Sequence, residues 1–520
     1  MREGATAPPG VLGTVTARVR GRTRAAFAAM NDLLLESATR LAERIRAGEV
    51  SSREVVEVHV AQIERVNPQL NAVVRTRYDE ARAEAERADA LRARTRPEDL
   101  PPLHGVPCTI KECFALAGMP NASGLVARRH LVSERDATAV ARLRAAGAIP
   151  LGVTNTSELC MWMESNNRVY GRTNNPYDPA RIVGGSSGGE GAIVGAGGSP
   201  FGLGSDVGGS IRGPAFFNGV FGHKPTGGMV PATGQYPIAA GAGLRYLTTG
   251  PITRRATDLM PLLRVLAGPD GLDAGCRHFD LGDPAQVDLS GRTLLDVPDN
   301  GVLRVSPELR RAQEEAVRVL RDRGMRVREV SFKGLEKQFD VWSAMMADAQ
   351  EHPFSHMLGE GRRVRAGLEI VKHLLGRSQH TLPASLLALV DPVPKLFPGL
   401  ARRMIALGHE LRASFAEALG PDGVLLYPSY TVPAPRHGVP VRWLVRMHHP
   451  WAYLAIVNVL ELPATQVPVG LGAEGLPLGF QVVSGHGNDH VTIAVAMELE
   501  RALGGWTPPA MAGLGCVTAA

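Results

Sequence analysis

Aromatic residues are scarce in this chain of 520 residues, and cysteines are few. Phe, Trp and Tyr make up 5% of the sequence, and there are only five cysteines. These are Cys108, Cys113, Cys160, Cys276 and Cys516. An odd number of cysteines with no C-x-x-C pair argues against a disulfide scaffold and against a structural zinc site. The cysteine content therefore fits a reducing compartment.

Long hydrophobic runs are also missing. No stretch approaches the ~20 apolar residues of a membrane-spanning helix. Near the N-terminus, residues 11–15 are broken by glycine and threonine and lack the apolar core of a secretory signal. We therefore expect a cytoplasmic protein.

Several kinds of site are absent from the sequence. It contains no H-E-x-x-H zinc signature. The net charge is +6, but no basic stripe is interleaved with aromatic residues, so nucleic acid is not an expected partner. We expect neither a metal ion nor a cofactor.

Short apolar runs alternate with helical patterns, which predicts an α/β fold. Strands are expected at residues 107–110 and 149–153, with a helix between them that is capped by Asp136 and stops at Gly147. Ser51 opens a capping box, and the helix that follows it is expected to end at Asn67-Pro68.

One lysine and two serines carry the candidate chemistry. Lys111 ends an apolar run, while Ser186 and Ser210 lie in glycine-rich surroundings. A serine hydroxyl needs a base to become a good nucleophile, and a buried lysine can supply one, because burial disfavours its charged form. Ser210 is the better nucleophile, since the N–H groups of Val207, Gly208, Gly209 and Ser210 can converge on an oxyanion. Ser186 would then carry protons between Lys111 and Ser210.

Residues 184–215 resemble the amidase signature family throughout. They read Gly-Gly-Ser-Ser-Gly-Gly and then Gly-x-Gly-x-Asp-x-Gly-x-Ser-Ile-Arg-x-Pro, and Lys111 follows Gly-Val-Pro at the expected distance. The resemblance implies one large mixed β-sheet covered by helices on both faces. It also implies that Lys111 is the base, that Ser186 is a bridging serine after a cis peptide bond, and that Ser210 forms an acyl-enzyme.

The wider matches are most similar to the fatty-acid amide hydrolase branch, in particular its second vertebrate type. They include residues 154–159, 170–178 and 214–225. The resemblance implies hydrolysis of fatty-acyl, aryl or other hydrophobic amides, and of esters or carbamates. Cys160 and the three residues after it would line the acyl pocket, with plain core packing as the alternative.

Other functions fit parts of the same tract. Residues 184–188 match G-x-S-x-G, the nucleophile elbow of α/β-hydrolases, but a polar turn rather than a strand precedes them. No Lys-Ser/Thr follows in the spacing of a phosphate-binding loop. A scaffold without activity is a further alternative. The nearest rival is a glutamine amidotransferase-type subunit that acts with partner chains.

The resemblance predicts a domain organisation around a single catalytic unit. A basic, poorly ordered segment at 1–30 precedes an amidase domain at 30–505, and 506–520 form a tail. Within the domain, 100–265 are the signature core and 270–420 a variable substrate or cap region. Residues 382–400 are apolar with basic flanks, which suits either a buried helix pair or peripheral contact with a membrane. Assembly of two copies of the chain into a homodimer is a further prediction.

Overall fold

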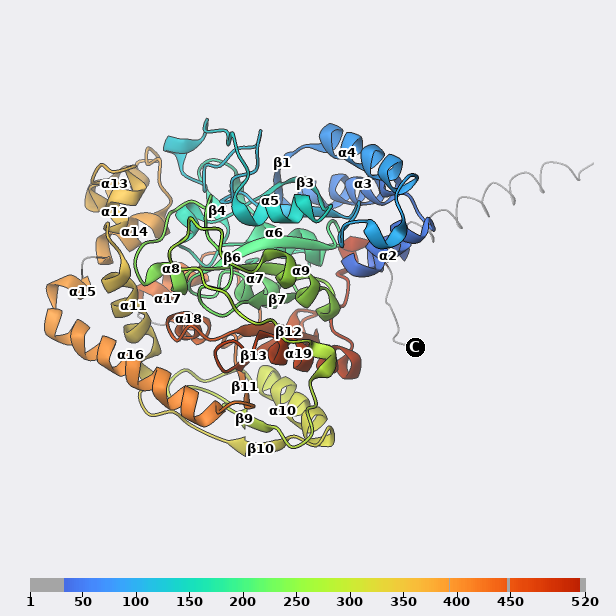
Figure 1. Ribbon diagram of the computed structural model, residues 1–520. Helices are drawn as coiled ribbons and strands as arrows, with labels where there is room; N and C mark the ends of the chain where they lie inside the picture. Colours follow the sequence, from blue (N-terminus) through green and yellow to red (C-terminus); the bar gives the residue numbers. More distant parts are fainter. Residues whose placement is uncertain (1–31, 392, 447–448, 515–520) are drawn as a thin grey trace, which may run out of the picture.

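A computed structural model describes residues 32–391, 393–446 and 449–514. The predicted basic segment at 1–30 lies outside the described residues. A sheet of 11 strands runs through the middle of the molecule in the order β1-β3-β2-β6-β8-β7-β12-β13-β11-β9-β10 (Figure 1). The strands are β1 (Val73–Thr76), β2 (Pro107–Lys111), β3 (Ile149–Thr154), β6 (Phe201–Asp206), β7 (Phe221–Lys224), β8 (Thr248–Thr253), β9 (Thr293–Asp296), β10 (Arg326–Glu329), β11 (Val424–Tyr427), β12 (Ala464–Leu471) and β13 (Pro477–Ser484).

The sheet is mixed, as predicted. β2 pairs in parallel with β3 and β6, and β9 pairs in parallel with β10 and β11. The other neighbours in the sheet are antiparallel. Two further short strands, β4 (Asn166–Asn167) and β5 (Gly171–Arg172), form a separate hairpin.

Helices precede, connect and follow these strands. The N-terminal half holds α2 (Ala38–Ala47), α3 (Ser52–Leu70), α4 (Tyr78–Arg92), α5 (Thr138–Ala145), α6 (Gly188–Gly195), α7 (Arg212–Phe217), α8 (Gly243–Tyr246) and α9 (Leu259–Leu266). The C-terminal half holds α10 (Pro307–Asp322), α11 (Gln338–Ala349), α12 (Phe354–Leu358), α13 (Ala366–Leu374), α14 (Leu382–Val390), α15 (Val393–Leu396), α16 (Pro398–Leu419), α17 (Val439–Val445), α18 (Ala452–Val459) and α19 (Asp489–Leu503).

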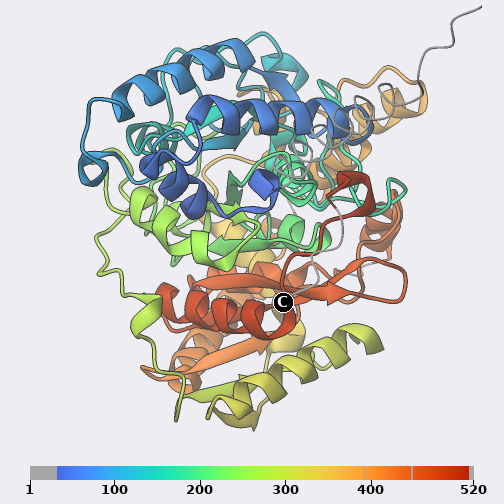
Figure 2. The ribbon, with the colours of Figure 1, turned by 90° about the vertical axis from the view of Figure 1, so that its right-hand side faces the viewer.

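Helices cover both faces of the sheet, and β11 shows why its sequence requires this. Successive side chains of a strand point to opposite faces. Val424 and Leu426 belong to one core cluster, to which α10 and α19 also contribute, whereas Leu425 and Tyr427 belong to another, with α11, α16 and α18. Figure 2 shows α10 and α19 in front of the strands. A strand that is apolar on both sides must be covered on both sides.

Two predicted helix boundaries were wrong. Helix α3 continues through Pro68 to Leu70 and ends at Asn71, whose φ of 52° is left-handed. The side chain of Asn67 accepts hydrogen bonds from the N–H groups of Ala72 and Val73, which secures the chain just beyond the helix. A proline removes only one backbone donor, and here that loss does not stop the last turn.

The second correction concerns Asp136, which does not cap α5. The helix begins at Thr138 after Ala137. The carboxylate of Asp136 instead accepts a hydrogen bond from the N–H of Ala117 and forms an ion pair with Arg144. Asp136 therefore binds Ala117 and Arg144 instead of capping the first turn of α5.

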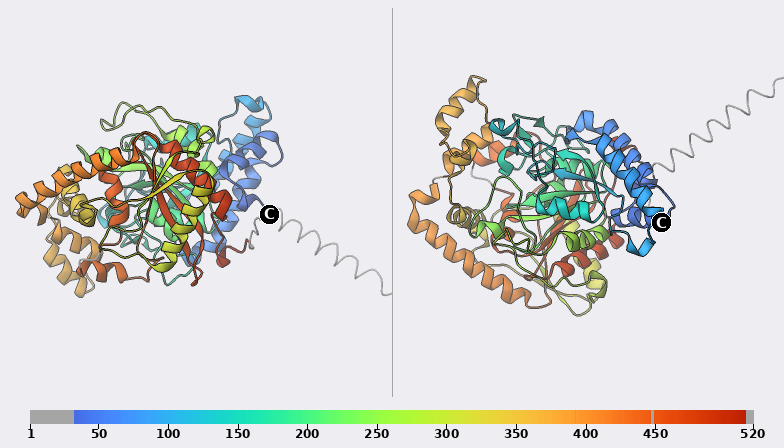
Figure 3. Two further views of the ribbon diagram at one scale, coloured as in Figure 1. Left: turned by 90° about the horizontal axis from the view of Figure 1, so that it is seen from below. Right: turned by 45° about the horizontal axis from the view of Figure 1, so that its top comes forward.

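The helices α13 to α16 lie at the opposite end of the molecule from α2 to α4, as both views of Figure 3 show. Many of their apolar side chains are exposed, and we call these residues the α13–α16 apolar patch. They are Leu368, Val371, Leu374, Leu375, Leu389, Val390, Val393, Leu396, Phe397 and Leu400. Among the described residues, no helix combines the length and the apolar character needed to cross a membrane.

Candidate functional site

Lys111, the last residue of β2, is fully buried beside two serine hydroxyls. Its side-chain nitrogen Nζ lies 2.6 Å from Ser186 Oγ and 3.0 Å from Ser205 Oγ. Ser205 comes from β6, the parallel neighbour of β2. The carboxyl ends of adjacent parallel strands lie at one edge of a sheet, so Lys111 and Ser205 meet there. Ser205 was not predicted as a site residue from the sequence.

Ser186 reaches Lys111 from a turn that only glycine can form. Gly184 has a φ of 82°, and a Cβ on it would lie 2.7 Å from the backbone nitrogen of Pro214. A Cβ on Gly185 would lie 2.2 Å from the carbonyl oxygen of Trp162. The peptide bond between Gly185 and Ser186 is cis, as the resemblance implied.

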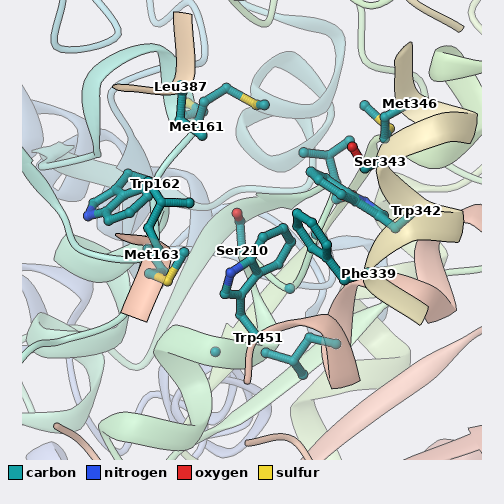
Figure 4. A pocket seen from close by; sticks show the side chains of 18 of the residues that line it. Met161, Trp162, Met163, Ser210, Phe339, Trp342, Ser343, Met346, Leu387 and Trp451 are labelled. Carbon is teal, nitrogen blue, oxygen red and sulfur yellow. The ribbon is translucent and has the colours of Figure 1, made fainter. Parts of the chain in front are cut away.

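Ser210 follows β6 and lies in the same region. Its carbonyl accepts a hydrogen bond from the N–H of Ser187, which connects the two serine-bearing turns. Its side chain is 8% exposed, and Figure 4 shows its hydroxyl pointing into a cavity. The structure thus brings Lys111 and Ser186 into direct contact and places Ser210 on a turn that is hydrogen-bonded to the residue after Ser186.

A buried ion pair braces the turn that carries Ser210. The Asp206 carboxylate accepts hydrogen bonds from Gly209 N–H at 2.7 Å and Ile211 N–H at 3.0 Å. It also pairs with the Arg212 guanidinium at 3.0 Å. Burial alone would raise the pKa of Asp206, but Arg212 and Lys224 hold that pKa well below its usual range. The carboxylate therefore stays charged and fixes the turn.

The same brace changes the predicted set of oxyanion donors. The N–H of Gly209 already donates to the Asp206 carboxylate at 2.7 Å, so it is not free to donate to an oxyanion beside Ser210. The sequence pattern could not reveal this, because it does not say where each N–H of a glycine-rich turn points. Val207, Gly208 and Ser210 retain the candidate role.

The cavity at Ser210 is predominantly apolar and draws on segments far apart in the sequence. Cys160 and the residues after it line it, as expected. Sequence reasoning missed the aromatic side chains of Phe339, Trp342 and Trp451, which Figure 4 shows around Ser210. The indole N–H of Trp342 donates to the carbonyl of Val207 at 2.9 Å, and its ring packs edge-on against that of Trp451. The only hint in the sequence was that aromatic residues are few. Any aromatic site had to be built from these few residues.

Two buried carboxyl groups lie close to the lysine in sequence or space. Glu190 accepts hydrogen bonds from the hydroxyls of Thr109 and Thr154, and burial raises its pKa to about 8. Glu112 accepts hydrogen bonds from two backbone N–H groups and from the Tyr170 hydroxyl, and burial also raises its pKa to about 8. Both are anchored to neighbouring loops or strands and neither lines the cavity at Ser210.

The α/β fold carries a buried lysine and two serines in glycine-rich turns beside an apolar cavity. This combination defines an amide hydrolase of the amidase class. The family model for Amidase matches residues 54–493, and the chain belongs to this family. It is therefore a hydrolase of carbon–nitrogen amide bonds, as predicted.

Two relatives and one solved structure show which members of the family this chain resembles. The chain is 47% identical to Fatty-acid amide hydrolase 2-A of Danio rerio, over 92% of this chain and 91% of the relative. It is 44% identical to Fatty-acid amide hydrolase 2 of Homo sapiens, again over 92% and 91%. The structure of 6-aminohexanoate cyclic dimer hydrolase matches with a TM-score of 0.76 at 26% identity, over 90% of this chain and 97% of that one. The predicted likeness to the fatty-acid amide hydrolase branch is confirmed.

The pKa of Glu190 gives a first prediction. The folded protein keeps this proton up to about pH 8, whereas an unfolded glutamate loses it near pH ~4.3. The folded state thus binds the extra proton, and the group stabilises the fold less as the pH rises from about 5 to about 8. Glu190→Gln should flatten this decline, by at most about 1.4 kcal/mol per pH unit in the free energy of unfolding.

Urea denaturation at several pH values measures the effect. Glu43→Gln, at an exposed position, is the control and should keep the slope of the wild type. Parallel curves for Glu190→Gln and the wild type would contradict a proton held on Glu190.

Proposed function

We propose that this chain is a serine amidohydrolase with a Ser-Ser-Lys mechanism. Uncharged Lys111 takes a proton from Ser186, Ser186 takes one from Ser210, and Ser210 attacks the amide carbonyl. The observation that carries this proposal is the 2.6 Å contact between Lys111 and Ser186, buried next to the cavity that holds Ser210. A base in direct contact with a relay hydroxyl is what activation of a serine requires.

The second half of the reaction reverses the relay. Ser186 delivers a proton to the leaving nitrogen, because an amine anion is a very poor leaving group, and water then releases the acid from Ser210. The negative oxygen of the intermediate would lie among the N–H groups of Val207, Gly208 and Ser210. Each such donor is worth about 3–4 kcal/mol when the transition state depends on it.

The cavity favours a hydrophobic acyl group. Its walls are aromatic, methionine and leucine side chains, so a fatty-acyl or aryl amide would bury its apolar surface there at about 25 cal/mol per Å². The relatives named as fatty-acid amide hydrolases are consistent with this preference. Esters and carbamates with similar acyl groups should also react.

A glutamine-specific subunit is the alternative, and the cavity argues against it. Free glutamine carries a carboxylate, which a binding site normally pairs with Arg or Lys. Among the described residues that line this cavity there is neither. A cytoplasmic location and a homodimer stay predictions of the sequence.

Replacement of the nucleophile tests the function directly. Ser210→Ala should lower hydrolysis of fatty and aryl amides by roughly 10⁴-fold or more, because no hydroxyl remains to form the acyl-enzyme. Turnover of a series of amides with graded acyl length, with glutamine included, is the measurement. Ser290→Ala, on the exposed surface, is the control. Substantial activity in Ser210→Ala, or a clear preference for glutamine, would overturn the proposal.

The role of Lys111 has its own signature in the pH profile. Lys111→Ala removes the base, and hydroxide replaces it in part only when the pH is high. The loss in kcat/KM for an amide should therefore be steeper at neutral pH than at high pH. The exposed Lys333→Ala serves as control and should follow the wild type. A uniform loss across the pH range would remove Lys111 as base.

We also propose that residues 382–400 contact a membrane surface as part of the α13–α16 apolar patch. Phe397 is 60% exposed and Leu400 57% exposed, and the exposed cations Arg402 and Arg403 follow on α16. Apolar side chains flanked by cations suit the interface of an anionic lipid bilayer. The patch adjoins the active-site cavity. Its residue Val390 lines that cavity, as does Leu387, which lies on the same helix α14.

Flotation with anionic liposomes measures this contact. The wild type should float, and Phe397→Ser combined with Leu400→Ser should bind at least about tenfold more weakly, because each buried side chain contributes about 1.5–3 kcal/mol. Leu272→Ser, which changes an even more exposed leucine elsewhere, is the control. Failure of the wild type to float would end the proposal.

A further inference from the structure

Two cysteine thiols lie in contact beside Lys111. Cys113 follows the lysine by two residues at the end of β2, and Cys160 ends a short 3-10 helix, Glu158–Cys160. The two thiols are close enough for each to shift the pKa of the other. Both cysteines are reduced, and nothing in the proposed mechanism uses either thiol.

Small molecules can reach Cys160 from two sides. It lines the cavity that contains Ser210 and also the adjoining cavity beside Tyr236 and Met357. Its backbone is left-handed, with a φ of 59°, and it is 8% exposed, whereas Cys113 is completely buried behind it. An agent in either cavity therefore meets Cys160 first.

The surroundings of Cys160 favour its thiolate. Ser123 Oγ and Thr156 Oγ1 each lie 3.4 Å from its sulfur. Burial acts to raise the pKa of Cys160, but the Cys113 thiol and these hydroxyls lower that pKa well below its usual value. The pKa of Cys113 is raised, by burial and by its neighbour. One thiolate and one thiol thus lie side by side, which is the pairing that disulfide chemistry uses.

The remaining described cysteines lack this arrangement. Cys108 lies on the same strand as Lys111, and burial raises its pKa. Burial also raises the pKa of Cys276, to about 11. Both therefore remain protonated thiols of low reactivity.

We propose that Cys160 and Cys113 form a modification site for hydrogen peroxide, which converts them to a disulfide and thereby switches off amide hydrolysis.

The chemistry proceeds in two balanced steps. The Cys160 thiolate attacks one oxygen of the peroxide, the O–O bond breaks, and Cys160 becomes a sulfenic acid while hydroxide leaves. The Cys113 sulfur then attacks the sulfenic sulfur, the S–S bond forms, and a second hydroxide leaves. Hydroxide takes up the proton that Cys113 loses. One thiolate, one thiol and one peroxide thus give one disulfide, one water and one hydroxide, with both sulfurs oxidised and both peroxide oxygens reduced.

The disulfide would act on the site through Ser205. The Cys113 sulfur lies 3.8 Å from Ser205 Oγ, which in turn lies 3.0 Å from Lys111 Nζ. A covalent bond to Cys160 must draw Cys113 out of its present contacts, because bonded sulfurs are only about 2.05 Å apart. The lysine would lose part of the packing that holds it against Ser186.

Peroxide titration of the purified full chain tests the proposal. Graded hydrogen peroxide should produce a Cys113–Cys160 disulfide, seen by peptide mass spectrometry, together with a loss of amide hydrolysis of about a hundredfold, the effect of a displacement of about 1 Å at a catalytic group. Dithiothreitol should restore activity. In Cys113→Ala, dimedone should trap the sulfenic acid on Cys160, since no second thiol can resolve it.

Matched variants separate this site from the others and from the hydrolytic mechanism. Cys108→Ala and Cys276→Ser should form the disulfide as the wild type does, and Cys160→Ser should form none. Ser210→Ala should still form it, so the chemistry of the thiols is read independently of turnover. Thiols that stay free under peroxide, or a disulfide without loss of hydrolysis, would overturn the proposal. Loss of hydrolysis without the disulfide would equally overturn it.

Discussion

The contact between a buried lysine and a serine hydroxyl is the constraint on which the rest of this molecule depends. Lys111 is fully buried, so its amino group needs polar partners within the protein, and Ser186 and Ser205 supply them. To bring these partners together, β2 and β6 must run in parallel as neighbours. The glycine-rich turn must also pass close enough to Pro214 that a side chain on Gly184 would collide.

The reactive turn and the acyl cavity are built from different parts of the chain. Signature residues between 100 and 265 supply the lysine, both serines and the Asp206–Arg212 brace. The aromatic wall comes from α11 and from Trp451 beside α18, and it is joined to the turn by the hydrogen bond between Trp342 and Val207. A change in the region between 270 and 420 can therefore reshape the cavity while the chemistry beside it stays the same.

Much of this arrangement could be predicted from the sequence, because the patterns that reveal it lie within short stretches of neighbouring residues. Strands such as β2 and β11 are short apolar runs, and the serine-bearing turns have a fixed spacing of glycines, so both can be recognised from neighbouring residues alone. What escaped depends on which partner each polar group selects, and a local residue pattern does not reveal this. Asp136 pairs with Arg144 and Ala117 instead of capping α5, the N–H of Gly209 is taken by Asp206, and Ser205 contacts Lys111 across two strands. Trp342 and Trp451 could not be placed at the cavity because nothing in their local sequence points there.

The two ends of the sheet have a consequence for how the protein behaves in crowded solution. A sheet edge offers unpaired amide groups that another chain can extend into a fibre. Here β10 closes one end with only four residues, Arg326–Glu329, three of them charged, and β1 closes the other end with four residues that include Arg75. Such short edges, with charged side chains along them, discourage strand-to-strand stacking of neighbouring molecules. An 11-stranded sheet can in this way remain a discrete particle at high concentration.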